Sequence, residues 1–165
     1  MKRCLAIIGL MIASLSCSPA NRFNGPVSNL FPKEVGRFKL RGEVKAVDVP
    51  PPDSSGALRP TDGAYAQYES TGGDELTMQI VNYNSAADAE EALKKMRENM
   101  QNLNSAAKLS QSARSNKAGK NTGDVLILED TRTAIDQVLW TDGSLLYVIS
   151  GKGSAAPMEF ESNIP

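Results

Sequence analysis

The chain has 165 residues, of which 41% are hydrophobic, 22% charged and 5% aromatic, a length that fits one domain with a single core. Its 18 Lys and Arg residues against 19 Asp and Glu residues give a net charge of -1, which excludes a broad basic surface for nucleic acid. The sequence contains no histidine, which excludes Ser-His-Asp and Cys-His catalysis and histidine metal sites. Its two cysteines, Cys4 and Cys17, both lie near the N-terminus. We therefore expect no disulfide framework, no metal and no cofactor.

The first sixteen residues have the layout of a secretory signal peptide. Lys2 and Arg3 give a positive start, residues 5–15 form a mostly apolar stretch, and small residues precede Cys17. A helix of these eleven residues spans about 16 Å, roughly half of the hydrocarbon core of a bilayer. A buried core helix is the alternative, but the terminal position and the positive charges speak against it. We predict that residues 1–16 are removed.

The end of this segment resembles the lipobox of bacterial lipoproteins, in which a cysteine after small residues becomes the acylated first residue. Ser16 and Cys17 fit that pattern, whereas the leucine stands one place later than usual, at Leu15. An unmodified chain that begins at Cys17 would carry one unpaired thiol into an oxidising compartment, and acylation removes that thiol. Plain secretion is the alternative, because residues 14–16 and 18–20 also fit ordinary signal-peptidase sites.

The resemblance also implies a location. In Gram-negative lipoproteins an aspartate after the acylated cysteine favours retention in the inner membrane, and here that residue is Ser18. The resemblance therefore implies the outer membrane, facing the periplasm; the alternative is a soluble secreted or periplasmic protein. Removing 16 of the 165 residues takes away Lys2 and Arg3 and leaves 149 residues with 16 positive and 19 negative charges, a net charge of -3. The expected membrane contact is the lipid anchor, and no nucleic acid partner is expected.

A tether and one domain follow Cys17. Residues 18–29 are rich in Ser, Asn, Pro and Gly without an apolar period, so residues 17–29 are predicted to be the lipidated cysteine and a flexible tether. A single domain is predicted over residues 30–165. Within it, Pro32 suits the start of a short helix and Gly36 its end.

Three strands and a helix are predicted next. The first strand covers residues 37–49, with a bulge at Gly42, and a surface loop over residues 50–62 follows it. The second and third strands cover residues 64–69 and 75–83. Ser85 is a predicted N-cap of a helix that runs to about Leu103. Its apolar stripe, which suits a core contact better than a ligand, consists of Ala89, Leu93, Met96, Met100 and Leu103.

The C-terminal half is predicted to be a loop followed by three strands and a short helix. Over residues 104–122, the sequence predicts a loop, with room for one or two helical turns from Ser105 before it. The loop is either solvated or in contact with anionic lipid headgroups through Lys108, Arg114, Lys117 and Lys120. Strands are predicted over residues 124–129, 135–141 and 144–150, with a type I′ turn at Asp142-Gly143. That turn would pair Trp140 with Leu145. Both faces of these strands are apolar, which predicts that they are covered, one by the helix from Ser85 and one by a helix over residues 154–163.

These elements predict an α+β fold. Its mostly antiparallel central sheet has about six strands, with a long helix on one face and a short C-terminal helix on the other. In element order, the arrangement resembles small envelope lipoproteins and, more distantly, the PsbP-like architecture of a sheet between helices. The resemblance implies a fold and no activity.

Three patterns are weighed as chemical sites. Ser105 and Lys108 match the S-x-x-K spacing of penicillin-binding enzymes, but the companion S-D-N and K-T-G motifs are absent, and a polar helix start explains the match as well. The second pattern lies in the turn between a predicted strand and the start of the C-terminal helix, where it either holds an anion or only forms the turn. It consists of Gly151, Lys152, Gly153 and Ser154.

The third pattern is a loose set of acidic residues that lacks the spacing of a calcium-binding loop. Whether any pair of them could hydrolyse a glycoside depends on the distance between the two carboxylates. The set is Asp124, Glu129, Asp130, Asp136 and Asp142. Trp140 and Tyr147 fit the core better than a pocket.

The sequence favours a non-enzymatic envelope lipoprotein that binds a protein or a small ligand. A small envelope hydrolase that uses carboxylates or the Ser105/Lys108 pair is the first alternative. An accessory subunit of an envelope assembly is the second, and a broad exposed apolar surface would favour it. Neither the ligand nor the oligomeric state follows from the sequence.

Overall fold

The computed structural model describes residues 22–48, 58–103, 107–115, 121–130, 132–153 and 155–164. The predicted signal peptide, Cys17, Ser105, Lys117, Lys120 and Ser154 lie outside these residues. The first half contains η1 (Val27–Leu30), β1 (Glu34–Val35), β2 (Phe38–Ala46), β3 (Asp62–Ser70), β4 (Glu75–Asn82) and α1 (Ala86–Leu103). The second half contains β5 (Ala107–Ser115), β6 (Asn121–Asp130), β7 (Ile135–Asp142), β8 (Leu145–Lys152) and α2 (Ala155–Asn163).

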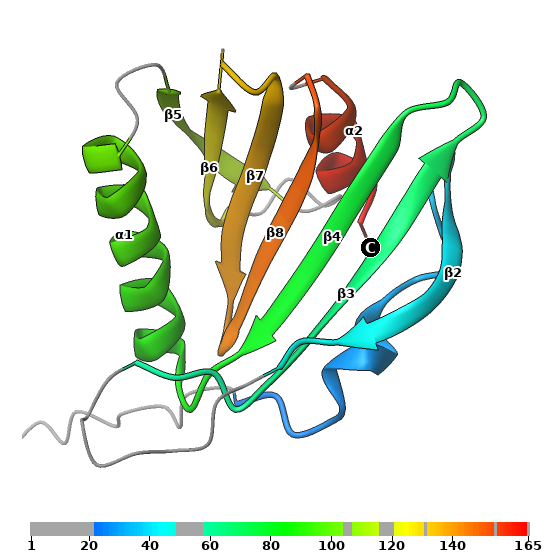
Figure 1. The fold of residues 1–165 in the computed structure, drawn as a ribbon. Helices are drawn as coiled ribbons and strands as arrows, with labels where there is room; N and C mark the ends of the chain where they lie inside the picture. The colour runs from blue at the N-terminus through cyan, green and yellow to red at the C-terminus, as the bar shows by residue number, and fades with distance from the viewer. Residues whose placement is uncertain are drawn as a thin grey trace, which may run out of the picture.

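The described strands form one sheet, in the order β1-β2-β3-β4-β8-β7-β6-β5, and every neighbouring pair is antiparallel. The chain builds this sheet from two meanders, β1–β4 and β5–β8, and each meander is followed by an α-helix (Figure 1). The two meanders join where β4 pairs with β8. The α+β class and the antiparallel sheet are confirmed, with eight strands instead of about six.

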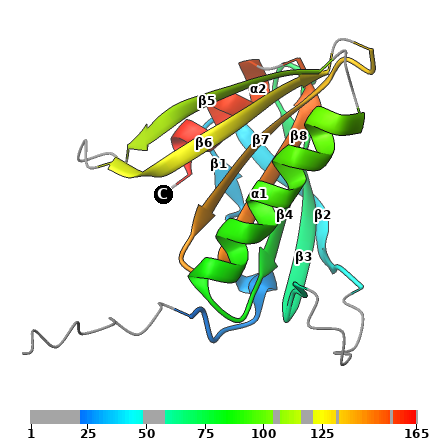
Figure 2. The same cartoon turned by 90° about the vertical axis from the view of Figure 1, so that its left-hand side faces the viewer.

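The helices α1 and α2 lie on opposite faces of the sheet (Figure 2), and each face carries its own apolar core. On one face, the Phe160 ring of α2 lies edge-on to the rings of Phe38 and Tyr68, with centroids 5.4 and 4.7 Å away. On the other face, Ala89, Leu93, Met96 and Met100 of the predicted stripe pack on the core that includes residues of β7 and β8, which confirms their core role. The Ser85 Oγ accepts a hydrogen bond from the Asp88 amide at 3.1 Å, as expected of an N-cap.

Two of the strands lie where the sequence predicts other structure. β5 occupies the predicted loop over residues 104–122, because nine of its residues pair with β6, whose Val125 and Leu128 are buried. Pairing with a buried neighbour here overrides the low strand preference of Ser, Ala and Lys. The predicted short helix from Pro32 to Gly36 is also wrong. Gly36, at a φ of 57°, lies in the turn that pairs β1 with β2.

The β7–β8 hairpin turns one residue later than predicted. Asp142 pairs with Leu145, so the two loop residues are Gly143 and Ser144, and Trp140 faces Tyr147 instead of Leu145. Gly143 has a φ of 57°, and no positive φ is found at Ser144. Glycine at the first of two loop residues is typical of a type II′ turn, not of the predicted type I′ turn. The shift moves each partner by two residues, so every side chain keeps its predicted face.

A ring of hydrogen bonds, which we call the N-terminal latch, fastens residue 23 to the sheet. The Phe23 amide donates to Ser144 Oγ at 3.0 Å, and the Ser144 hydroxyl donates to Asn82 Oδ1 at 2.7 Å. The Asn82 side-chain amide closes the ring by donating to the Phe23 carbonyl at 3.0 Å. Four residues later, Val27 is fully buried in the core. The packed domain therefore includes residues that the sequence assigns to the tether.

The aromatic pair Trp140 and Tyr147 belongs to the core, as predicted. The two rings are stacked, with centroids 4.7 Å apart and an interplanar angle of 7°. The Arg114 guanidinium lies 4.9 Å above the Trp140 ring and forms an ion pair with Glu161 of α2. Arg114 was expected in a solvated or membrane-facing loop, but only 16% of its side chain is exposed. Its guanidinium helps to hold the β5–β6 hairpin against α2.

Burial raises the pKa of Tyr147 to about 12, with a further increase from Asp142 and an opposing effect of Arg114. Because this pKa is higher in the folded protein than the ordinary value of 10.0, the buried neutral phenol contributes its full stabilisation at pH values below 10.0. That contribution is lost as the pH rises toward 12. We expect the free energy of unfolding to fall over this interval and to fall less in Tyr147→Phe. Burial also raises the pKa of Tyr68 and Tyr83, so part of the decline remains. Urea titrations across the interval measure both declines, and equal declines would contradict the account.

Candidate functional site

The sheet face that carries α1 is only partly covered. α1 packs on β7, β8 and β5, while β2 and β3 lie at the other side of the sheet (Figure 1). On β3, the residues of this face include the exposed Gln67 and Glu69, whereas the alternate residues Ala66 and Tyr68 are buried on the opposite face. This alternation leaves a polar surface beside α1, which we call the open face.

A continuous row of polar side chains crosses the open face, one from each of five neighbouring strands. The register pairs Arg41 with Gln67, Gln67 with Thr77, Thr77 with Ser150, and Ser150 with Gln137. Since neighbouring strands lie about 4.8 Å apart, this polar row is about 19 Å long. Its members are a guanidinium, two amides and two hydroxyls, so it offers both hydrogen-bond donors and acceptors.

A cavity of about 530 Å³ lies at the polar row. Its wall includes side chains of β2, β3, β4, β7 and β8 and the β3–β4 turn, among them Arg41, Gln67, Thr77, Ile135, Ser150 and Lys152. Ile135 is 45% exposed and gives this wall an apolar patch. The size and the lining of the cavity suit a small polar molecule or a segment of a polymer, either of which would be partly enclosed.

The cationic groups of the cavity are balanced by carboxylates. Arg41 forms an ion pair with Glu75 at 2.7 Å and lies 3.8 Å from Glu69. On the β3–β4 turn, Asp74 is paired with Arg37 at 2.7 Å. Within the described part of the chain, Lys152 is a lining cation with no recorded ion pair. The cavity therefore favours hydrogen bonding over strong charge recognition.

Gln137 brings an unpaired acceptor to the end of the polar row. Its side-chain amide nitrogen donates to Ser150 Oγ at 3.3 Å. Its Oε1 atom is buried and has no hydrogen-bond partner among the described residues. A buried acceptor without a partner costs roughly 1–3 kcal/mol, and Gln137 is not among the residues that line the cavity.

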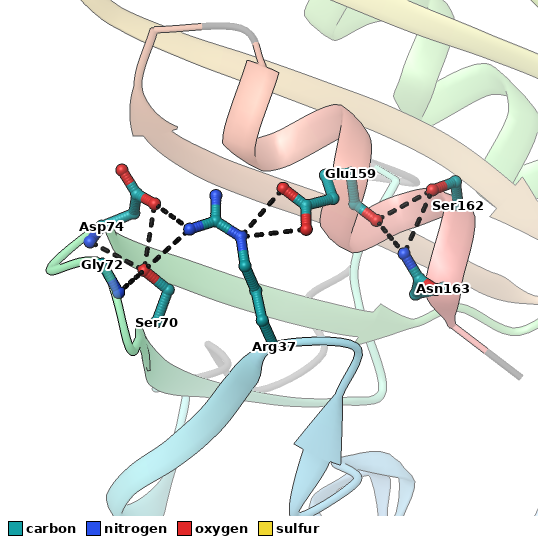
Figure 3. A network of polar contacts seen from close by, with 7 residues as sticks. All are labelled: Arg37, Ser70, Gly72, Asp74, Glu159, Ser162 and Asn163. Carbon is teal, nitrogen blue, oxygen red and sulfur yellow. Dashed lines mark hydrogen bonds and ion pairs between the residues drawn. The ribbon is translucent and has the colours of Figure 1, made fainter.

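Arg37 fastens one rim of the cavity to α2 (Figure 3). Its Nε donates to both carboxylate oxygens of Glu159, at 2.9 and 3.0 Å, and its other arm reaches Asp74. The hydrogen bond to Glu159 is the main reason why the pKa of Arg37 is raised, so the guanidinium stays charged. These exposed ion pairs position the β3–β4 turn and add little to overall stability.

Ser70 organises the same turn from inside. Its Oγ accepts hydrogen bonds from the amides of Gly72 and Asp74, at 3.2 and 3.0 Å, and donates to the Asp74 carboxylate at 3.0 Å (Figure 3). Ser70 is 5% exposed, so these bonds lie in a partly dry environment. The rim of the cavity is thus held in place from two sides.

The proposed anion-binding residues are divided between the two faces. Gly151 is buried, and a side chain there would collide with Leu76 and crowd Pro157 of α2. Lys152 lies on the opposite side and lines the cavity. Gly153 has a φ of 72° and forms the exposed turn before α2. Gly151 therefore serves close packing, and anion binding at this turn stays a prediction.

The S-x-x-K pattern does not lie on one helix. α1 ends at Leu103, and Lys108 is part of β5, where its ammonium group lies 3.4 Å from the Glu129 carboxylate. Lys108 is therefore an exposed partner of a neighbouring strand rather than a residue one helical turn from a serine.

The acidic residues mostly fasten turns and strand neighbours. Asp136 accepts the Asp130 amide at 3.1 Å, Asp130 accepts the Arg132 amide at 2.9 Å, and Asp124 accepts the Gln111 side chain at 2.7 Å. The described residues contain no group of three or more carboxylate or cysteine side chains that could hold a metal ion. Among the described helices, none has the length and hydrophobicity needed to cross a membrane.

Sequence patterns did not reveal the polar row, because its members come from five separate strands and become neighbours only through the register. The one local signal is that residues 75–80 alternate between polar and apolar. No family model matches the chain, and comparisons with curated proteins and with solved structures found no match.

Proposed function

We propose that the protein is a non-enzymatic cell-envelope lipoprotein whose domain binds a polar, uncharged ligand at the open face of its sheet. Anchoring rests on the signal-like N-terminus and the lipobox-like residues before Cys17. Binding rests on one structural observation, the polar row with its cavity on a part of the sheet that α1 leaves open.

The polar row supports binding because its hydrogen-bonding groups are fixed in space. Each of the five side chains projects from a strand that is paired with its neighbours, so the row needs little reorganisation to meet a ligand. A length of about 19 Å fits a chain of several units better than a single ion.

Charge and geometry narrow the ligand class. The ion pair of Arg41 with Glu75 leaves the lining without a strong field, which disfavours a highly charged ligand. Extended peptides usually bind along the edge of a sheet through main-chain bonds, whereas this row consists of side-chain amides and hydroxyls on a face. We therefore infer a hydroxyl-rich chain, of which a neutral oligosaccharide is the test case.

The described surface favours a ligand over a permanent assembly partner. The large hydrophobic residues exposed on it are Ile135 and Met158, at 45% and 44%. Stable obligate interfaces bury a broad apolar patch, and two such residues are few for one. The expected location is the outer membrane facing the periplasm, with the soluble form as the alternative.

The anchoring part is tested by the intact mass of the mature protein from the membrane fraction. We expect a chain that begins at Cys17 and carries diacylglycerol, because the cysteine is the acylated residue of a lipobox. Cys17→Ser is expected to lose that mass and to leave the membrane fraction, since the remaining net charge of -3 offers little attraction to anionic lipid. An unmodified wild-type chain in the soluble fraction would overturn anchoring.

The binding part is tested by NMR titration of the mature domain with a panel of neutral oligosaccharides. We expect amide shifts centred on Gln67, Thr77 and Ser150, because these residues line the cavity. Gln67→Ala removes one amide of the polar row and is expected to weaken binding about tenfold, which is roughly 1.4 kcal/mol. Gln101→Ala, which changes an exposed glutamine of α1, serves as the matched control.

Two results of the titration itself would contradict the binding proposal. One is the absence of shifts across the whole panel, and the other is a set of shifts centred away from the polar row. Equal loss of binding in Gln67→Ala and Gln101→Ala would also count against it, since only Gln67 lies in the row.

A further inference from the structure

The N-terminal latch sets how far the domain can stand from an anchored Cys17. The ring of bonds among Phe23, Asn82 and Ser144 holds both main-chain polar groups of residue 23, and Ser144 is fully buried. Only six residue steps separate Cys17 from Phe23. Fully extended, they span at most about 22 Å, roughly half of what the thirteen residues of the predicted tether would allow.

The cavity lies at the other end of the same strand. β4 runs from Glu75, which lines the cavity, to Asn82, which belongs to the latch. At about 3.3 Å per residue, these two ends are about 23 Å apart. In Figure 1, the β3–β4 turn lies at the opposite end of the sheet from η1 and the start of α1.

The net charge of the domain also favours keeping its cavity end away from the lipid surface. The chain from residue 17 onward carries a net charge of -3, so an anionic lipid surface does not attract the domain as a whole. A domain fastened at one end and without such attraction keeps that end nearest to the lipid.

We propose that the N-terminal latch holds the domain upright on the membrane, with the β7–β8 turn toward the lipid headgroups and the cavity facing away from them. This inference rests on the proposed function in that it takes Cys17 to be acylated. It implies that the ligand is met in the aqueous compartment and is not a lipid of the anchoring membrane.

The orientation is tested with fluorescent labels on two single-cysteine variants of the acylated protein in vesicles of phosphatidylcholine and phosphatidylglycerol. A Cys17 sulfur that carries diacylglycerol does not react, so the introduced cysteine takes the label. Asp142→Cys places it at the latch end, and Thr71→Cys places it on the β3–β4 turn; both residues are exposed. With a quencher on the lipid headgroups, we expect quenching at residue 142 and none at residue 71.

A latch variant separates orientation from mere tethering. Ser144→Ala removes the hydroxyl shared by Phe23 and Asn82, and it is expected to reduce the difference between the two labels. Ser28→Ala, which changes an exposed serine of η1, is the matched control and should keep the difference. An NMR spectrum of Ser144→Ala verifies that the variant is folded, and the wild-type pair of labels decides the orientation on its own.

The outcomes distinguish this inference from the proposed function. Equal quenching at the two labels, or stronger quenching at residue 71, in protein whose mass shows acylation overturns the orientation and leaves the lipoprotein proposal standing. A folded Ser144→Ala protein that keeps the full difference overturns the role of the latch. A mass without acyl chains overturns the anchoring part of the proposed function, and the orientation falls with it.

Discussion

The antiparallel pairing of β4 with β8 is the contact on which the rest of the structure depends. It joins the two meanders, and its register sets three features together. Thr77 faces Ser150 in the polar row, Asn82 reaches the β7–β8 turn that carries Ser144, and Gly151 lies beside Leu76, where the missing side chain makes room for α2. A slip of this pairing would disturb the candidate site, the latch and the helix contact at once.

The candidate site and the N-terminal latch belong to one arrangement of the sheet. Along β4, the end near Glu75 contributes to the cavity, and the end at Asn82 holds the segment that leads to Cys17. At the far end, Arg37 and Ser70 hold the β3–β4 turn in place (Figure 3). Arg37 bonds to Glu159 of α2, and Ser70 bonds to Asp74 of the turn. This arrangement supports the proposed orientation, in which the cavity faces away from the membrane.

The period-two pattern predicted the faces of the strands, because successive side chains of a strand point to opposite faces of the sheet. Gly42 likewise marked a true irregularity, since it has a φ of 75° and the register shifts between Arg41 and Lys45. The β7–β8 turn was misplaced because Ser144 is needed in a bond to Phe23, 121 residues away. β5 was missed for a similar reason, since its polar sequence becomes a strand only beside β6. Such long-range partners leave no local pattern.

The most direct test of this account is the β4–β8 register in solution, measured by cross-strand nuclear Overhauser contacts in the mature domain. The account predicts backbone contacts between Thr77 and Ser150 and between Ile80 and Tyr147, as the pairing requires. Contacts of Thr77 with Val148 or Lys152 would place the strands two residues out of register. That result would separate the members of the polar row and contradict both the candidate site and the latch.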